Sequence, residues 1–211
     1  MRKVMLELAP RNLGCLMAQP AVVLLLSGGL DSMVAADVIR EQSGVRLLPL
    51  FVDYGQPAAL REGEAARTFC RLRHLQLSKA QVAGFKKLAD VAAHRPRLQP
   101  FLPGRNLVLL TIAGIVALSK GARFVGIGAI ADRAFPDTTN SFFNAFNAIG
   151  PMALGHQVSV MSPLVHSSKA AVVEMGKRLG TPLLASYSCY VGRSRPCGRC
   201  LGCKLRAQVL S

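Results

Sequence analysis

The segment 26–32, with the sequence LSGGLDS, constrains this chain more than any other. It follows the apolar run 21–26, which is typical of a buried strand. It precedes residues 33–39, which indicate the first turns of a helix. The two glycines permit close approach to the backbone, and a helix N-terminus presents unpaired N–H groups with partial positive charge. The segment therefore predicts a strand–loop–helix unit that binds pyrophosphate.

Two other interpretations of this loop were weighed. It is not a Walker A loop, because it has no Gly-Lys-Ser/Thr sequence and lacks the six-residue spacing. An ordinary strand-to-helix turn with a serine cap is the simpler alternative. The combination of Ser27, Gly28, Gly29, Asp31 and Ser32 favours the pyrophosphate loop, because it is far more specific than a pair of glycines.

Strands and helices are predicted to alternate along the rest of the chain. Strands are expected at 46–52, 74–78, 124–129 and 158–161, and helices at 58–73, 107–118, 142–148 and 169–179. A short strand at 4–8, a weak helix at 86–94 and a proline-rich loop at 95–100 are also expected. This alternation predicts a Rossmann-like, doubly wound parallel α/β sheet with right-handed crossovers.

Several polar residues stand where such a sheet binds ligands, at strand ends and in first helical turns. Asp53 to Gln56 follow the second strand, beside the first loop. Arg105 and Lys169 each open a helix, where a cation opposes the helix dipole and therefore suits a bound anion. The alternatives are an ordinary Asp-Gly turn at 53–56 and a salt-bridged surface arginine at 105.

The C-terminal tail carries four cysteines with the spacing C-x7-C-x2-C-x2-C, namely Cys189, Cys197, Cys200 and Cys203. Four thiolates at short separations suit a closed, structural zinc site. A 4Fe–4S cluster also takes four cysteines and is the alternative. We therefore divide the chain into an N-terminal extension (1–19), an α/β domain (20–185) and a small C-terminal zinc-binding tail (186–211).

Composition and charge indicate whether the protein binds nucleic acid or a membrane. The formal net charge is +15, but the basic residues are dispersed, so direct tRNA binding is not favoured. No apolar run reaches about 18 residues, so no membrane span is expected. Residues 1–19 lack the apolar centre of a signal peptide, and we therefore expect a cytoplasmic protein.

Taken in order, five motifs resemble the 7-cyano-7-deazaguanine synthase family of the ATP pyrophosphatase (PP-loop) superfamily over residues 20–206. They are SGGLDS at 27–32, DYGQ at 53–56, PGRN at 103–106, the Lys169 segment, and SCY with CGRCLGCKLR in the tail. The resemblance implies an ATP-dependent ligase. ATP adenylates the carboxylate of 7-carboxy-7-deazaguanine, ammonia displaces AMP to give the amide, and a second ATP drives formation of the nitrile. It also implies a homodimer.

The same resemblance implies roles for individual residues. Asp31, Arg105 and Lys169 would be catalytic, and Mg²⁺ would bridge the phosphates with Asp31 or Asp132 as oxygen ligands. The nucleotide would be bound by Leu26, Ser27, Gly28, Gly29, Leu30, Asp31, Ser32, Val52, Tyr54, Gln56, Arg105 and Asn106. The acid substrate would be bound by Gly128, Asp132, Phe135 and Asp137.

One loop departs from the family pattern. Residues 128–138 read GAIADRAFPDT, where the family usually carries an asparagine, a cysteine and a following arginine. Two alternative functions therefore stay open. A divergent member would transfer the activated deazaguanine acid to another amine, such as a protein N-terminus in antiviral defence. A tRNA-modifying ATP pyrophosphatase is the second alternative.

Overall fold

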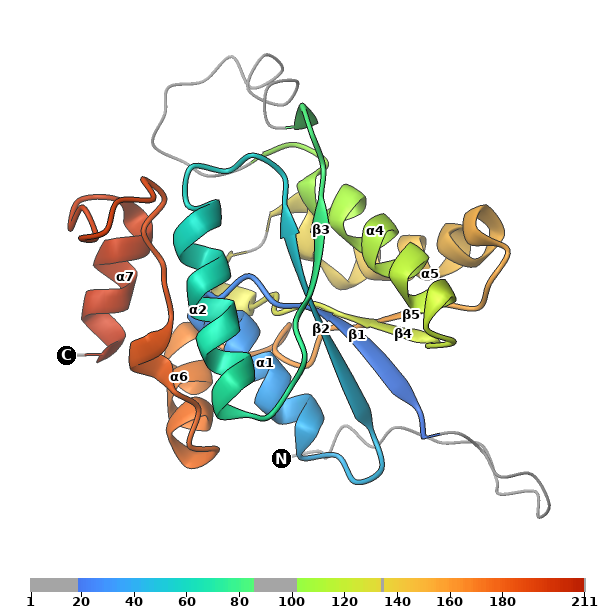
Figure 1. Cartoon of the computed structure of the whole chain (residues 1–211), viewed down its shortest axis with the longest axis horizontal. Coiled ribbons are helices and arrows are strands. Elements are labelled where there is room, and N and C mark those ends of the chain that lie inside the picture. The colour runs from blue at the N-terminus through green and yellow to red at the C-terminus, as the bar shows by residue number, and fades with distance from the viewer. Residues whose placement is uncertain (1–18, 86–101, 134, 211) are drawn as a thin grey trace.

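A five-stranded parallel sheet forms the centre of the protein (Figure 1). The computed structural model describes residues 19–85, 102–133 and 135–210. The strand order is β3-β2-β1-β4-β5, and every neighbouring pair is parallel. The strands are β1 (Ala21–Leu25), β2 (Arg46–Asp53), β3 (Ser78–Gln81), β4 (Phe124–Gly126) and β5 (Ser159–Met161). The predicted doubly wound parallel α/β sheet is confirmed.

Helices cover both faces of the sheet. One face packs against α1 (Leu30–Arg40), α2 (Ala59–Leu72) and α6 (Lys169–Arg178), and the other against α4 (Arg105–Ser119) and α5 (Asn140–Leu154). β1 shows the division, because Val22 and Leu24 lie in the first core and Val23 and Leu25 in the second. Right-handed crossovers produce this arrangement, since the chain moves outward from β1 in one direction and then in the other.

The elements mostly begin and end near their predicted bounds, with three differences. The strand predicted at 124–129 is shorter, because β4 ends at Gly126. The third strand was predicted at 74–78, and this is wrong, because β3 spans Ser78–Gln81. His74 instead takes a left-handed conformation (φ 54°) at the end of α2, and the Leu75 N–H donates to the Cys70 carbonyl. Helix α5 (Asn140–Leu154) is longer than the predicted helix at 142–148. The Thr139 side chain caps its start, and it continues through Pro151 to a left-handed Gly155.

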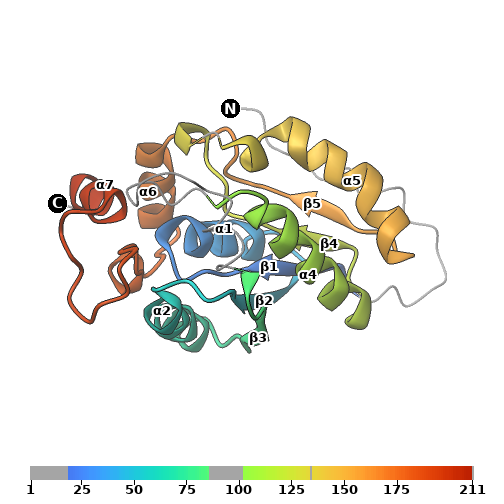
Figure 2. The same ribbon diagram turned by 90° about the horizontal axis from the view of Figure 1, so that it is seen from above.

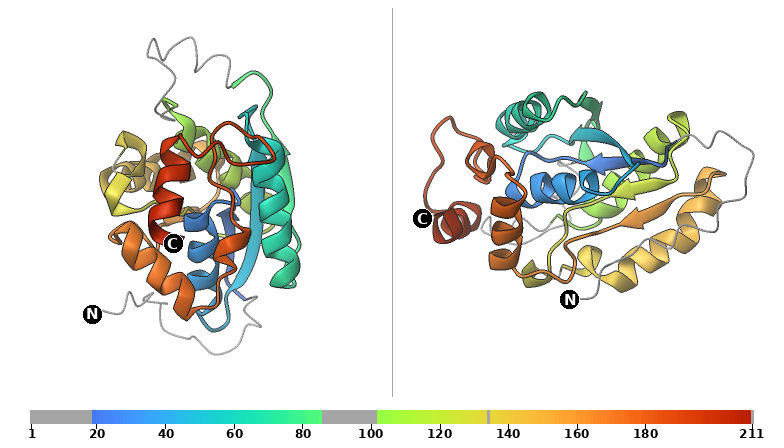
Figure 3. Two further views of the ribbon diagram at one scale, coloured as in Figure 1. Left: turned by 90° about the vertical axis from the view of Figure 1, so that its left-hand side faces the viewer. Right: turned by 90° about the horizontal axis from the view of Figure 1, so that it is seen from below.

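The C-terminal tail packs against the first face of the domain. The short 3-10 helix η3 (Leu183–Ala185) leads into the cysteine segment, and α7 (Leu201–Leu210) ends beside α6 (Figure 2, Figure 3). Buried Asp37 of α1 anchors the approach to the tail, because its carboxylate accepts from Arg73 (2.9 Å) and Thr181 (2.8 Å). In the described residues, no helix is long and apolar enough to span a bilayer.

Some predictions fall outside the described residues. These are the N-terminal strand at 4–8, the weak helix at 86–94 and the loop at 95–100. Most of the predicted extension at 1–19 also lies there. The domain boundaries stay predictions.

Candidate active site

The candidate site lies at the carboxyl ends of β1, β2 and β4, where parallel α/β sheets bind ligands. The strand order reverses here, because β1 connects outward to β2 while β4 lies on its other side. A cavity of about 250 Å³ opens at this edge. Its polar lining comes from the loop after β1, the end of β2 and the start of α4, and includes Ser27, Asp31, Ser32, Tyr54, Gln56, Glu62, Arg105 and Asn106.

The loop after β1 is pressed against the first turn of α2. Gly28 has a φ of +75°, and a Cβ built on it would lie 2.2 Å from the carbonyl oxygen of Glu62. Only glycine fits this position without moving the backbone. Gly29 stands at the N-cap of α1 and has no side chain to occupy the first N–H groups. No side chain caps α1, so the serine-capped turn does not describe this loop, and the helix begins at the cavity, as an anion-binding helix start does.

Two serines stiffen the loop. Ser32 donates from its hydroxyl to the Gly29 carbonyl (2.9 Å), and the Ser27 hydroxyl donates to the Ser32 Oγ (3.1 Å). Gly128, in the segment after β4, closes the other side of the loop, because a Cβ there would meet the Ser32 backbone at 2.9 Å. The predicted loop residues and Gly128 are thus brought together at one point of the sheet.

Asp31 and Lys169 meet although they are 138 residues apart, with Lys169 Nζ 2.5 Å from Asp31 Oδ1. The Lys169 backbone N–H donates to Asp132 Oδ2 at 2.5 Å. Both members of the Asp31–Lys169 pair line a second cavity of about 220 Å³. Arg105 and Glu62 line both cavities, so the two cavities adjoin.

The turn after β2 is held by a chain of hydrogen bonds. The Tyr54 backbone N–H donates to Gln56 Oε1 (2.9 Å), and Gln56 Nε2 donates to Glu62 Oε2 (2.9 Å). Burial raises the pKa of the Glu62 carboxyl, although Gln56 and Arg105 oppose this. Burial also raises the pKa of Tyr54. Glu62 was not among the predicted site residues. The available signal was its position, in the first turn of the helix that follows DYGQ.

The predicted substrate residues are placed differently from one another. Gly128 lines the first cavity, whereas Asp132, Phe135 and Asp137 are not among the described residues that line either cavity. Asp137 is buried and accepts from the Asn106 backbone N–H (3.1 Å), and its own carbonyl accepts from Asn106 Nδ2 (3.0 Å). Its carboxylate therefore fixes the start of α4, where Arg105 stands. Substrate binding by these four residues stays a prediction.

The four tail cysteines converge. The Sγ atoms of Cys189, Cys197, Cys200 and Cys203 all lie within 4.8 Å of one another, so the donor set fits a metal ion. The pKa of the Cys189 thiol is lowered to about 6. Burial raises it, but N–H donors, among them the Cys197 backbone, outweigh this. Burial raises the pKa of Cys203 to about 12. Metal binding would require all these thiols to be deprotonated.

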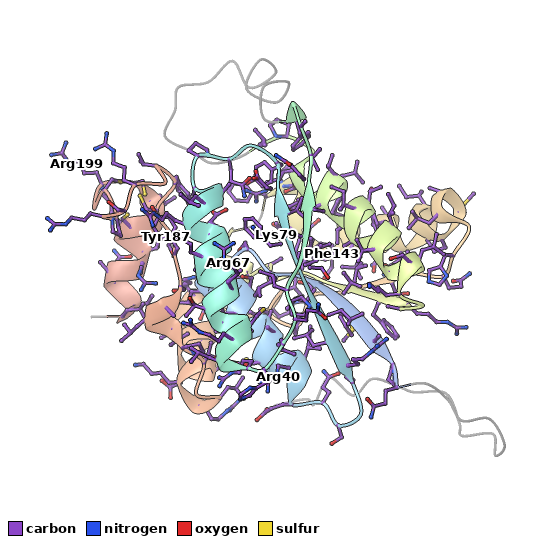
Figure 4. All side chains as sticks on the ribbon, in the orientation of Figure 1. Arg40, Arg67, Lys79, Phe143, Tyr187 and Arg199 are labelled. Atoms are coloured by element: carbon purple, nitrogen blue, oxygen red, sulfur yellow. The ribbon has the colours of Figure 1, made fainter. Side chains whose placement is uncertain are left out.

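The tail also forms one wall of the second cavity. Tyr187 lies on the C-terminal segment (Figure 4). Its backbone N–H donates to the Gly28 carbonyl (2.9 Å), and its hydroxyl donates to the Arg193 carbonyl (2.8 Å). Arg206 of α7 donates to the Leu184 carbonyl (2.9 Å) and to the Ser186 hydroxyl. Tyr187, Tyr190 and Arg206 line the cavity opposite Asp31 and Lys169. The sequence assigned Tyr187 and Tyr190 no site role, whereas Arg206 was expected to contribute to a positive field that helps to hold a carboxylate or phosphate substrate.

The parallel sheet and the glycine loop after β1 define a Rossmann-like α/β domain, which carries a four-cysteine tail. The U34-tRNA thiolase NcsA from Methanococcus maripaludis shares this fold, with a TM-score of 0.55 at 19% sequence identity. The alignment covers 92% of this chain and 65% of that chain, just under two thirds of its length. At this identity the likeness establishes the fold alone.

Sequence comparison identifies the family. The sequence model of the queuosine biosynthesis protein QueC matches residues 21–211. The 7-cyano-7-deazaguanine synthase of Synechococcus sp. (strain CC9605) is 35% identical over 92% of this chain and 94% of its own length. That of Gloeothece citriformis (strain PCC 7424) is 34% identical over 92% of both chains. The chain belongs to the queuosine biosynthesis protein QueC family, and it is an ATP-dependent ligase.

Proposed function

We propose that this chain converts 7-carboxy-7-deazaguanine and ammonia to 7-cyano-7-deazaguanine, with ATP as the activating substrate and AMP and pyrophosphate as products. The observation that carries the proposal is the similarity to 7-cyano-7-deazaguanine synthases along nearly the whole length of both chains. The relatives favour this function over transfer to a protein amine or to tRNA.

The geometry supports an adenylation site. Such a reaction needs little covalent chemistry from the protein, which must align ATP with the carboxylate and stabilise the charge of the departing pyrophosphate. The loop at residues 26–32 and the start of α1 would bind phosphate groups. Lys169 and Arg105 line the adjoining cavities and would meet phosphate oxygens, while Asp31 holds the Lys169 ammonium in place. Val52 and Tyr54 would lie beside the nucleotide.

Two metals complete the proposal. Mg²⁺ would neutralise phosphate charge, and Asp31 and Asp132 are the carboxylates beside Lys169 that would supply oxygen ligands. Zn²⁺ would be held by the four tail cysteines as a structural ion, since a site closed by four thiolates leaves no position for substrate. The zinc would hold the tail, and with it Tyr187 and Arg206, against the second cavity.

The proposal also includes the cellular compartment, the oligomeric state and the role of the loop at residues 128–138. We place the protein in the cytoplasm, where ATP is available and thiols stay reduced. We also propose a homodimer, as the family resemblance implies. The altered loop at residues 128–138 would read the deazaguanine base, and its divergence would tune the contact with the base.

AMP release tests the function. The purified protein, incubated with ATP and Mg²⁺, should release AMP only when both 7-carboxy-7-deazaguanine and an ammonium salt are present. AMP release that requires a protein amine, detected as a mass increase on that protein, would instead establish the antiviral-defence type of reaction.

A further inference from the structure

Two carboxylates line the adjoining cavities among the described residues, and they are engaged differently. Asp31 is ion-paired with Lys169 at 2.5 Å. Glu62 accepts a hydrogen bond from the neutral Gln56 amide at 2.9 Å. Glu62 faces both cavities, so its carboxylate lies where the nucleotide side and the tail side of the site meet. This is the place where an activated acyl group and an incoming nucleophile would come together.

The proposed reaction brings a small cation to this place. Ammonia exists mostly as ammonium at neutral pH, so it must first be bound as a cation and then lose a proton. A partly buried carboxylate suits both tasks, because its charge attracts ammonium and a raised pKa makes it a better proton acceptor. Burial is the largest influence on the pKa of Glu62 and raises it, Asp53 at the end of β2 raises it further, and Arg105 on α4 lowers it.

The backbone of Glu62 is fixed as a base requires. Gly28 lies against the Glu62 carbonyl, so the Glu62 backbone cannot move toward the phosphate loop without rearranging it. The Glu62 N–H donates to the Ala58 carbonyl at 2.8 Å, and Gln56 fixes the carboxylate. The side chain is therefore held between the phosphate loop and the turn after β2.

We propose that Glu62 is the ammonium-binding carboxylate and general base of this enzyme. The assignment rests on the proposed function, which supplies the acyl adenylate and the ammonium. Glu62 accepts one proton from bound ammonium. The lone pair of the resulting ammonia forms a C–N bond to the acyl carbon, and the C=O electron pair moves to oxygen. When the intermediate collapses, AMP leaves with the electron pair of the C–O bond. The nitrogen loses its second proton to water, and the amide is formed.

The test compares Glu62→Gln with the wild type in two half-reactions. Glutamine keeps an acceptor for Gln56 but cannot take up a proton. Acid-dependent exchange of pyrophosphate into ATP, which reports adenylation, should stay within about threefold of wild type, because uptake of the proton from ammonium occurs after adenylation. Amide formation from ammonium should fall by about 10²–10⁴-fold, the usual contribution of a general base.

Hydroxylamine provides a second nucleophile that distinguishes a base from a structural residue. It is largely unprotonated at neutral pH and needs no base before it attacks. Glu62→Gln should therefore form the hydroxamate from the adenylate at close to the wild-type rate. Equal losses with ammonium and hydroxylamine would overturn the assignment, and so would wild-type use of ammonium by the variant.

Two controls distinguish the proposed role of Glu62 from the proposed function on which it rests. Glu64→Gln removes a carboxylate on the same helix that pairs with Arg61 at 2.8 Å and lines neither cavity, and it should leave both half-reactions unchanged. Wild-type protein that shows no pyrophosphate exchange with 7-carboxy-7-deazaguanine would overturn the proposed function and the assignment together. Normal exchange in the wild type, with undiminished amide formation in Glu62→Gln, would overturn only the role of Glu62.

Discussion

Lys169 Nζ lies 2.5 Å from Asp31 Oδ1, and this contact joins the first turn of α6 to the first turn of α1. Both helices point their N-termini toward the same place, and a lysine there is opposed by two helix dipoles. Asp31 offsets part of that repulsion. The arrangement holds the Lys169 ammonium beside the phosphate loop, where it would interact with the negative charge of a bound nucleotide.

Replacement of Lys169 by alanine should slow adenylation. We expect a loss of about 10²–10³-fold in pyrophosphate exchange, because one charge-stabilising donor is removed from the leaving group. The matched control is Lys177→Ala, which removes an exposed lysine from the last turn of the same helix and should leave exchange unchanged. Exchange at the wild-type rate in Lys169→Ala would show that this residue does not serve the phosphates.

Gly28→Ala should damage the loop far more than a change at a glycine with similar backbone torsion. Gly44 has a φ of +77° and open space around it, so Gly44→Ala should cost about 1–2 kcal/mol from conformation alone. Gly28→Ala also places a Cβ 2.2 Å from the Glu62 carbonyl oxygen and should cost about a further 1–3 kcal/mol, with weaker ATP binding. Urea unfolding and ATP titration of both variants measure the difference. Equal stabilities of the Gly28→Ala and Gly44→Ala variants would mean that the loop can shift to accommodate a Cβ at position 28.

The sheet and its loop could be predicted from the sequence because their signals are local. Residues 21–32 form a strand, a glycine loop and a helix start within twelve positions. The third strand was misplaced because the left-handed His74 delays it, and a single polar residue gives little warning of that conformation. β3 itself, SKAQ, carries no apolar alternation that would have marked it.

The wall of the second cavity could not be predicted in the same way. Tyr187 reaches the loop, and Arg206 reaches the second cavity, only because the tail packs against α2 and α6, and this depends on contacts between distant segments. Glu62 likewise lies at the site because Gly28 packs against its carbonyl, and this contact is not evident from the sequence. Asp137 differs from these residues, because the sequence did predict a site role for it. Its motif suggested contact with substrate, whereas its carboxylate is hydrogen-bonded to the start of α4.

Cys200→Ser should remove the metal from the tail. Loss of one of four thiolates weakens zinc binding strongly, and the free energy of metal binding contributes to folding of the segment that supplies the ligands. Elemental analysis should fall from about one zinc per chain to well below one, with a lower melting temperature. Cys70→Ala is the control, because Cys70 is buried in the core away from the cluster and its variant should keep its zinc. A Cys200→Ser protein with full zinc content would contradict the four-thiolate site.

The pH dependence of amide formation should report Glu62. Burial raises the pKa of this carboxyl above its ordinary value, and only the deprotonated form can accept a proton. Below that pKa the base is protonated, so kcat/KM for ammonium should fall as the pH decreases through it, at a higher pH than an ordinary glutamate would give. In Glu62→Gln the acid limb that belongs to this group should disappear. An unchanged profile in the variant would assign the limb to another residue.

Mass spectrometry of the product formed from 7-carboxy-7-deazaguanine, ammonium, ATP and Mg²⁺ shows whether this chain makes the nitrile. We expect a nitrile, 7-cyano-7-deazaguanine, with two AMP released for each acid consumed. A reaction that stops at the adenylate, with pyrophosphate but no AMP released, or at the amide, with one AMP for each acid, would contradict this expectation and would direct attention to residues 128–138 and to a different acceptor.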